Sequence, residues 1–258
     1  LANDQVYVGF TVGLDYADPL LQPFEVFQRF KHHPSVRSLL EGGEVLVYGA
    51  RTIAAGGWQS LPRLDMPGAL LIGDAAGLLN FARLKGVHQA LRSGLLAAEH
   101  IARTGGSAGF DAVLRASAVG RELRTVRNIK PGFKHGLWFG LANGAFETLV
   151  AGHSPWTLAH QCNDTTLRRI DAAAESTPPE RTLPPRDRSA AVYLAQTVHD
   201  EQQPVHLKVA DTNVCAERCT REYANPCTRF CPAGVYEMVD DGGGGRRLQI
   251  NAANCVHC

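Results

Sequence analysis

Apolar positions near the start of the chain form two runs that are typical of β-strands, residues 6–14 and residues 44–53. Between them, Val26, Phe27 and Phe30 have the spacing of one face of a short helix. Prolines flank this segment and limit its length, because proline lacks the amide proton that a helix interior needs. The pattern therefore predicts two strands separated by a short helix.

A different pattern begins at residue 67. Residues 67–77 are apolar and end in small side chains, which predicts a strand leading into a tight loop. Apolar residues then recur at helical intervals over residues 85–103. These are Val87, Leu91, Leu95, Ala98 and Ile101. We expect a strand, a loop and a helix here, followed by a basic helical segment over residues 110–130 and an almost wholly apolar one over residues 135–151.

The composition of the chain changes after residue 170. Residues 171–188 are rich in proline and charge and show no periodic apolar face, which is typical of a linker. The part after about residue 190 is rich in cysteine and turn residues. We therefore expect four parts, which are residues 1–110, 111–170, 171–204 and 205–258.

Composition narrows the class of protein. The chain has 258 residues, of which 45% are hydrophobic, enough for a substantial core. Its formal charge of +1 gives no global field that favours nucleic acid as a partner. No stretch approaches the roughly 20 apolar residues that cross a bilayer, and the start lacks the basic segment of a signal peptide. Because it opens on a strand-like run without an initiator Met, we expect the chain to be a piece of a longer polypeptide.

The segment Gly73-Asp74-Ala75-Ala76-Gly77 follows the predicted strand and precedes a predicted helix that begins near Gly86 and Val87. A carboxylate at a strand end can accept hydrogen bonds from ribityl hydroxyls, and small residues let the backbone approach a cofactor. The helix start offers free N–H groups to the negative edge of a reduced flavin. The arrangement resembles the second FAD fingerprint of glutathione-reductase-type and hydroxylase-type flavoproteins. An ordinary tight strand-to-helix turn is the alternative.

Six of the seven cysteines lie within residues 215–258, which favours metal or redox chemistry over a disulfide framework. Cys231 precedes a proline, and Cys255 and Cys258 form a Cys-x-x-Cys pair. In ferredoxins a Cys-x-x-Cys-x-x-Cys run and a remote Cys-Pro bind one cluster. We expect Cys231, Cys255 and Cys258 to be three ligands of such a cluster, and the fourth to continue the run past Cys258. The alternative is a zinc ribbon with Cys227 or His257 as its fourth ligand.

Three further cysteines, Cys215, Cys219 and Cys227, are spaced unlike a ferredoxin run. We interpret them as buried small hydrophobic residues rather than as ligands of a second cluster.

A basic stretch precedes the apolar segment. Its cations are Arg115, Arg121, Arg124, Arg127, Lys130 and Lys134. Cations beside an apolar run that starts with Trp138 and Phe139 are typical of a segment lying in the interface of an anionic membrane. The alternative is a basic surface helix beside a core helix, because several apolar residues would also form one buried helical face. These are Trp138, Leu141, Ala145 and Leu149.

Specific motifs along nearly the whole chain match one family. They are Val12-Gly13-Leu14-Asp15-Tyr16, Lys31-His32-His33-Pro34-Ser35, Tyr48-Gly49-Ala50-Arg51, Gly56-Gly57-Trp58-Gln59-Ser60, Gly73-Asp74-Ala75-Ala76-Gly77, Pro155-Trp156-Thr157-Leu158, Arg229-Phe230-Cys231-Pro232-Ala233-Gly234-Val235-Tyr236-Glu237, Leu248-Gln249-Ile250-Asn251-Ala252 and Asn254-Cys255-Val256-His257-Cys258. In this order they resemble the C-terminal part of electron-transfer flavoprotein:ubiquinone oxidoreductases.

The resemblance implies an α+β fold. Residues 1–110 would be the rear of glutathione-reductase-like FAD-binding and quinone-binding domains with their mixed sheet, and residues 111–170 a membrane-facing segment. A linker, residues 171–204, would lead to a truncated ferredoxin-like [4Fe-4S] domain, residues 205–258. Gly73, Asp74, Gly77, Gly86 and Val87 would contact FAD, whose adenosine-binding segment would lie before residue 1, and Cys231, Cys255 and Cys258 would bind the cluster.

The resemblance also implies an electron-transferring-flavoprotein dehydrogenase. Electrons would pass from reduced electron-transfer flavoprotein through FAD and the cluster to ubiquinone, with no catalytic acid–base residues, and this piece alone would be inactive. The enzyme would be monotopic, on the cytoplasmic face of a bacterial inner membrane or the matrix face of the mitochondrial one, with no nucleic acid partner. The alternatives are a related flavoprotein dehydrogenase or reductase with a ferredoxin-like extension, or a zinc-ribbon interaction module.

Overall fold

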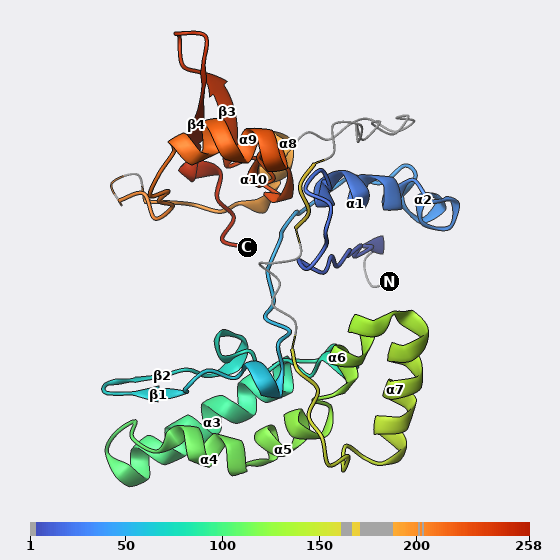
Figure 1. Cartoon of the computed structure of the whole chain (residues 1–258), viewed down its shortest axis with the longest axis vertical. Helices are drawn as coiled ribbons and strands as arrows, with labels where there is room; N and C mark the ends of the chain where they lie inside the picture. The colour runs from blue at the N-terminus through green and yellow to red at the C-terminus, as the bar shows by residue number, and fades with distance from the viewer. Residues whose placement is uncertain (1–3, 161–166, 171–187, 201, 203) are drawn as a thin grey trace. The chain divides into compact units, whose positions relative to one another are not determined.

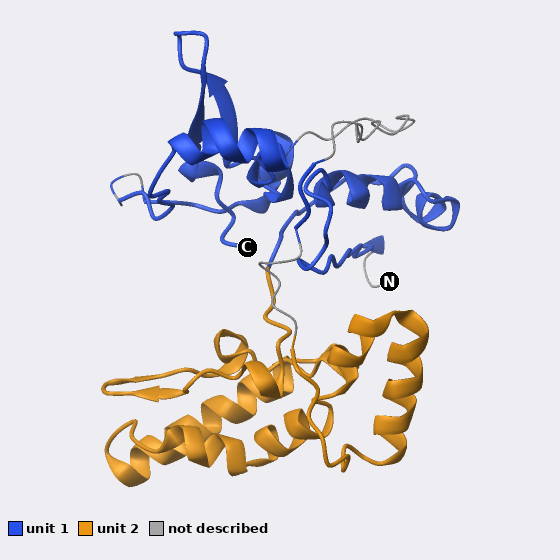
Figure 2. Ribbon diagram, viewed as in Figure 1, with its two compact units in different colours: residues 1–51, 162–258 blue, residues 52–161 orange. Residues whose placement is uncertain are grey.

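The structure is a computed structural model that describes all residues except 1–3, 161–166, 171–187, 201 and 203 (Figure 1). The chain forms two compact units, shown in different colours in Figure 2. Unit 1 comprises residues 1–51 and 162–258, and unit 2 comprises residues 52–161. The four expected parts were defined by the roles expected for them and not by packing, so that division stays a prediction. Most of the expected linker lies outside the described residues.

The N-terminal part of unit 1 contains two short helices, α1 (Pro23–Lys31) and α2 (Pro34–Leu40). Pro34 explains why the predicted helix is divided, because the residue before a proline is disfavoured in helical conformation. Proline occupies the first turn of both helices, where its missing amide proton costs nothing. Phe24 is the buried residue of α1, and its ring meets the Tyr48 ring edge-on at a centroid distance of 6.2 Å.

The C-terminal part of unit 1 combines short helices with one hairpin. The helices are α8 (Arg188–Ala195), a π-helical turn η7 (Cys215–Cys219), α9 (Thr220–Tyr223), α10 (Cys227–Phe230) and the 3-10 turn η8 (Ala252–Asn254). Strands β3 (Tyr236–Asp240) and β4 (Arg246–Ile250) pair antiparallel, with Tyr236 opposite Ile250. Beneath them lies a small core, which consists of Cys231, Ala233, Val235 and Val256.

Unit 2 is mainly helical (Figure 1). It begins with η2 (Trp58–Ser60) and a short antiparallel hairpin of β1 (Asp65–Met66) and β2 (Ala69–Leu70). Two 3-10 turns, η3 (Gly73–Ala76) and η4 (Phe81–Arg83), lead into α3 (Val87–Thr104), α4 (Phe110–Ala116) and α5 (Ala118–Thr125). The unit ends with α6 (Ile129–Gly132), η5 (Phe133–His135) and α7 (Leu137–Leu149). Its core contains Leu64, Leu78, Phe110, Leu114, Val119 and Leu123, all fully buried.

Helices and a little sheet confirm the α+β class, whereas the predicted strands over residues 6–14 and 44–53 are wrong. Neither run forms a strand, and the described strands make two separate antiparallel hairpins instead of the mixed sheet of a FAD domain. A strand needs a neighbour for its backbone hydrogen bonds, and no described segment pairs along these runs. Their apolar side chains therefore stay accessible, as Tyr7 (87% exposed) and Val47 (72%) show.

The predicted helix over residues 85–103 is confirmed as α3, but its apolar stripe is not the face that unit 2 buries. The stripe residues Val87, Leu91 and Leu95 are 76%, 71% and 62% exposed. The buried face carries Gln89, Ser93, Ala97 and His100. Within unit 2 the hydrophobic pattern thus identified the helix without identifying its packed side. No described helix is long and apolar enough to cross a membrane.

Candidate functional site

Cys231 directly follows α10 and is the most enclosed of the predicted cluster ligands. It is buried within the small core of unit 1, and the Val235 amide donates a hydrogen bond to its sulfur at 3.4 Å. Such amide-to-sulfur bonds favour the charged thiolate form that binds iron. Pro232 follows and cannot donate, so the chain turns away toward β3 without leaving an amide unpaired.

Cys255 and Cys258 follow η8 and lie near Cys231. Cys255 is half-buried and packs against the core that contains Cys231. Partial burial raises the pKa of the Cys258 thiol, and the nearby Cys231 and Cys255 thiolates raise it further. Burial also raises the pKa of Tyr236, with added contributions from all three thiolates. The structure thus brings the three predicted ligands together beside Tyr236.

Tyr48 and Arg51, from the N-terminal part of unit 1, contact the residues next to these three cysteines. The Tyr48 hydroxyl donates to the Pro232 carbonyl at 3.4 Å. Burial raises the pKa of Tyr48 to about 12, and the Cys258 thiolate contributes to the rise, so the hydroxyl stays protonated at neutral pH. Arg51 donates to the carbonyl oxygens of Val256 and His257. Residues 48–51 therefore hold the loop that carries Cys255 and Cys258.

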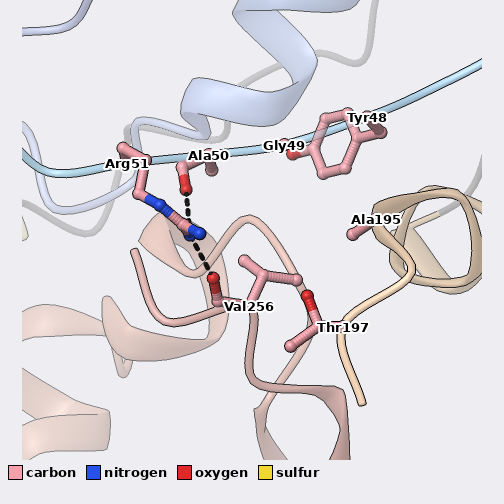
Figure 3. Close-up of a pocket in the computed structure, with 7 residues that line it drawn as sticks. All are labelled: Tyr48, Gly49, Ala50, Arg51, Ala195, Thr197 and Val256. Carbon is pink, nitrogen blue, oxygen red and sulfur yellow. Dashed lines mark hydrogen bonds between the residues drawn. The ribbon is translucent and has the colours of Figure 1, made fainter.

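A cavity of about 380 Å³ lies alongside these contacts. Its lining consists of Tyr48, Gly49, Ala50, Arg51, Ala195, Thr197 and Val256. Figure 3 shows the Arg51 side chain bonded to the Ala50 and Val256 carbonyls at its edge. The residue pattern had marked Tyr48 and Arg51 as part of a motif but not as neighbours of the cysteines, because almost 200 residues separate the two segments.

Histidines surround Cys255, and the sequence interpretation missed two of them. The rings of His199, His206 and His257 lie at centroid distances of 4.9 to 6.3 Å from one another. One nitrogen of His199 lies 2.7 Å from the Cys255 carbonyl oxygen. Ligand atoms of His206, Cys255 and His257 lie within 4.8 Å of one another, close enough to hold one metal ion. The spacing of His199 and His206 matches no common metal motif, so the sequence offered no signal.

The predicted flavin residues gather at the start of α3. Gly73 and Gly77 have φ of +61° and +73°, conformations that favour glycine. A Cβ on Gly86 would lie 3.0 Å from Asp74 Oδ1, so the exposed Asp74 carboxylate rests against the backbone that caps the helix. The Gly73 amide donates to Ser93 Oγ of α3 at 3.0 Å, which fixes the loop to the helix. Val87, the first residue of α3, is 76% exposed.

The start of α3 presents an open positive end. Its cap, Gly86, has no side chain to bond the free amides, and its first turn contains no acidic residue. One turn deeper, Glu122 of α5 accepts hydrogen bonds from Asn80 Nδ2 (2.7 Å) and, when that nitrogen carries the proton, His88 Nε2 (3.0 Å). Burial acts to raise the pKa of Glu122, but these bonds outweigh it and leave the pKa lowered.

The apolar segment before residue 151 forms α7, and the alternative interpretation, in which its apolar stripe is a buried face, is wrong within unit 2. Trp138 is 82% exposed, Leu149 85% and Leu141 49%, whereas Gly140 and Glu147 are the buried positions. The buried Glu147 carboxylate accepts hydrogen bonds from Asn128 Nδ2 at 2.9 Å and from the Ser154 hydroxyl at 3.0 Å, which compensate for its loss of water. The polar side of α7 faces the protein, and its large apolar side chains face outward.

The cations before α7 do not act as one group. Arg127 is buried, and its guanidinium donates to the Thr157 hydroxyl and to four backbone carbonyls. Lys130 donates to the Ala55 carbonyl at 3.1 Å and lies over the Phe81 ring. Exposed cations remain at Arg121, Arg124 and Lys134. Arg127 is therefore a structural residue, unlike the surface cation that the sequence suggested.

Two family models match the chain. The model described as "Electron transfer flavoprotein-ubiquinone oxidoreductase, 4Fe-4S" matches residues 184–258. The model described as "ETF-QO, ubiquinone-binding" matches residues 1–53. The two matched segments are the parts of unit 1 that meet at Tyr48, Arg51 and the three cysteines.

Curated relatives extend the likeness over the rest of the chain. Mitochondrial electron transfer flavoprotein-ubiquinone oxidoreductases are 44% identical in Rattus norvegicus and 43% in Homo sapiens, over 98% of this chain and 44% of each relative. The protein of that name from Pseudomonas aeruginosa is 41% identical over the whole chain and 49% of its own length. The chain thus spans less than half the length of each. Residues 1–53 and 184–258 thus match two family models of electron transfer flavoprotein-ubiquinone oxidoreductases, and nearly the whole chain is similar to the C-terminal part of the curated proteins of that name.

Proposed function

We propose that the chain is part of an oxidoreductase that accepts electrons from reduced electron-transfer flavoprotein and passes them through FAD and a [4Fe-4S] cluster to ubiquinone. One observation carries the proposal. Cys231, Cys255 and Cys258 converge at the junction between the 4Fe-4S segment and the ubiquinone-binding segment. Electron transfer to a quinone needs the two segments to be close, and the bonds of Tyr48 and Arg51 join them.

The residues present fit an iron-sulfur cluster. Three thiols stand together, and one of them receives an amide hydrogen bond. Burial, and then the two neighbouring thiolates, raise the pKa of Cys258, a penalty that a positively charged metal centre would remove. When bound, the cluster would supply one-electron chemistry. The chain's own part is to hold the thiolates, to enclose Cys231 and, through Arg51, to place a cation near Cys258.

The residues at the start of α3 fit a flavin. Gly86 has no side chain, and a Cβ there would crowd Asp74 Oδ1 at 3.0 Å. Asp74 presents an exposed carboxylate, and the amides of α3 offer the positive end of the helix dipole. In the proposed complex Asp74 accepts hydrogen bonds from ribityl hydroxyls, while Gly73, Gly77, Gly86 and Val87 let the cofactor approach the backbone. When bound, FAD would supply the redox chemistry of this unit.

The outward apolar side of α7 supports a membrane contact. Trp138 and Phe139 are exposed, and cations remain accessible at Arg121, Arg124 and Lys134. An exposed aromatic and aliphatic surface beside cations suits the interface of an anionic bilayer. We place the enzyme on the cytoplasmic face of a bacterial inner membrane or on the matrix face of the mitochondrial inner membrane.

One observation favours a second candidate, a zinc site. His206, Cys255 and His257 could hold one ion, and zinc accepts such nitrogen and sulfur ligands. Because both sites use Cys255, they exclude each other. The match of residues 184–258 to a 4Fe-4S domain favours the cluster.

The test compares Cys255→Ser with His206→Ala in the anaerobically purified holoprotein. We expect Cys255→Ser to abolish the paramagnetic signal of a reduced [4Fe-4S] cluster and quinone reduction, while His206→Ala retains iron. Cys162→Ser, which changes a cysteine outside the clustered six, is the matched control. A colourless protein with one zinc, lost in both Cys255→Ser and His206→Ala, would contradict the proposal.

A further inference from the structure

Cys215, Cys219 and Cys227 form a second group of thiols, which the proposed function leaves unused. They were expected to be buried packing residues, but all three are partly exposed, and none belongs to the buried core around Cys231. No disulfide joins any of them. Partly exposed, unpaired thiols contribute little to a core, so packing alone does not explain three of them.

The backbone around these thiols is held in an unusual conformation. Cys215–Cys219 forms a π-helical turn, a rare element that occurs frequently at functional sites. Two side chains bond the Cys215 carbonyl, Thr220 Oγ1 at 2.8 Å and Asn225 Nδ2 at 2.7 Å. The Asn225 backbone amide also donates to the Cys219 carbonyl at 3.4 Å. Asn225 is 4% exposed, so its hydrogen bonds are shielded from water and stabilise the conformation of the turn.

A tight reversal then returns the chain to this turn. Ala224 and Asn225 both have positive φ, +52° and +51°, a left-handed conformation that costs energy in residues other than glycine. The reversal brings Cys227, the first residue of α10, back toward Cys215 and Cys219. Asn225, two residues before Cys227, bonds the carbonyls of both Cys215 and Cys219, so the start of α10 is held against the π-helical turn. Three thiols from two segments therefore lie around one short turn.

The spacing to the neighbouring cluster site agrees with two adjacent metal centres. Cys215, Cys219 and Cys227 alone match no ferredoxin run, but Cys227 together with Cys231-Pro232 reproduces the last part of the bacterial one, Cys-x-x-x-Cys-Pro. In two-cluster ferredoxins the Cys-Pro residue of that run binds one cluster and the preceding cysteines bind the other. The spacing of Cys227 to Cys231-Pro232, which reproduces part of a ferredoxin run, favours an iron-sulfur cluster over a single zinc ion at this group.

We propose that Cys215, Cys219 and Cys227 bind a second iron-sulfur cluster through three thiolates, next to the cluster at Cys231. This second site goes beyond the proposed function and does not depend on it, because Cys215, Cys219 and Cys227 are not ligands of the cluster proposed there. Each thiol loses its proton on binding, so assembly releases protons and weakens as the pH falls.

The experiment measures iron, acid-labile sulfide and zinc in the anaerobically purified holoprotein, with paramagnetic resonance before and after dithionite reduction. We expect about seven or eight iron atoms per chain, and about four in a Cys219→Ser/Cys227→Ser variant. Cys162→Ser is the matched control and should retain the wild-type content. A Cys255→Ser variant should lose the first cluster and keep the second, so failure of either assignment is recognised separately.

Three results would overturn the proposal: about four iron atoms in the wild type, unchanged iron and spectra in Cys219→Ser/Cys227→Ser, or one zinc that this variant loses. Retained FAD would show that the variant is folded. If it does not fold, the wild-type iron content and the two resonance signals decide alone.

Discussion

Arg127 offers the sharpest test of how unit 2 is held together. A guanidinium has five N–H donors, and Arg127 makes five hydrogen bonds, with donor–acceptor distances of 2.7 to 3.0 Å. The acceptors are Thr157 Oγ1 and the carbonyls of Arg124, Gly152, Ser154 and Trp156. Because Arg127 is 7% exposed, water cannot replace these bonds without opening the segment after α7.

The magnitude follows from the number of bonds. At about 1 kcal/mol net for each bond, and with some carbonyls recovering water, Arg127→Ala should lower the free energy of unfolding by about 3 to 5 kcal/mol. Arg127→Lys keeps the charge but has three donors, so it should lose at least two bonds and about 2 to 3 kcal/mol. Arg124→Ala, an exposed position one turn earlier, is the matched control and should change stability by less than about 0.5 kcal/mol.

Tryptophan fluorescence isolates the effect, because Trp58, Trp138 and Trp156, all the tryptophans of the chain, lie in unit 2. With a urea m value of about 2 kcal/mol/M, Arg127→Ala should lower the unfolding midpoint by roughly 2 M. Equal midpoints for Arg127→Ala and Arg124→Ala, or a wild-type midpoint for Arg127→Lys, would refute the structural role.

Three further predictions concern the flavin, the membrane and pH. Asp74→Ala should weaken FAD retention on dialysis about tenfold to a hundredfold, and Asp74→Asn, which keeps an acceptor, should weaken it less; equal retention in all three proteins would remove Asp74 from the site. Trp138→Glu should reduce binding to anionic vesicles in flotation by about tenfold or more, whereas Tyr193→Glu, an exposed aromatic of unit 1, should not; identical losses would place the contact elsewhere. Because the folded pKa of Glu122 is lowered, its contribution is present above its ordinary pKa of 4.5 and is lost as the pH falls through the folded pKa. Urea unfolding of Glu122→Gln should therefore lose part of the acid dependence of the wild type, and an unchanged pH profile would contradict this.

The sequence by itself determined those features whose signal is local. Helical spacing identified α3, the glycines identified the turn before it, and Cys-x-x-Cys with a remote Cys-Pro identified three thiols that the structure brings together. These features depend on residues close in sequence, where backbone preferences and side-chain periodicity act directly. The family resemblance, confirmed by the matches to residues 1–53 and 184–258, rested on such motifs.

The tertiary structure decided which surfaces pack. The predicted strands over residues 6–14 and 44–53 formed no sheet, because a strand is stabilised by a partner that periodicity cannot name. The apolar stripe of α3 is exposed within unit 2, since burial depends on what lies opposite a helix and not on its own pattern. The sequence suggested that Arg127 is a surface cation, but in the structure it bonds three carbonyls that lie more than 20 residues away along the chain. The second group of cysteines likewise becomes visible as a site only when the reversal at Ala224 and Asn225 brings Cys227 back, because contact between distant residues is a property of the folded chain.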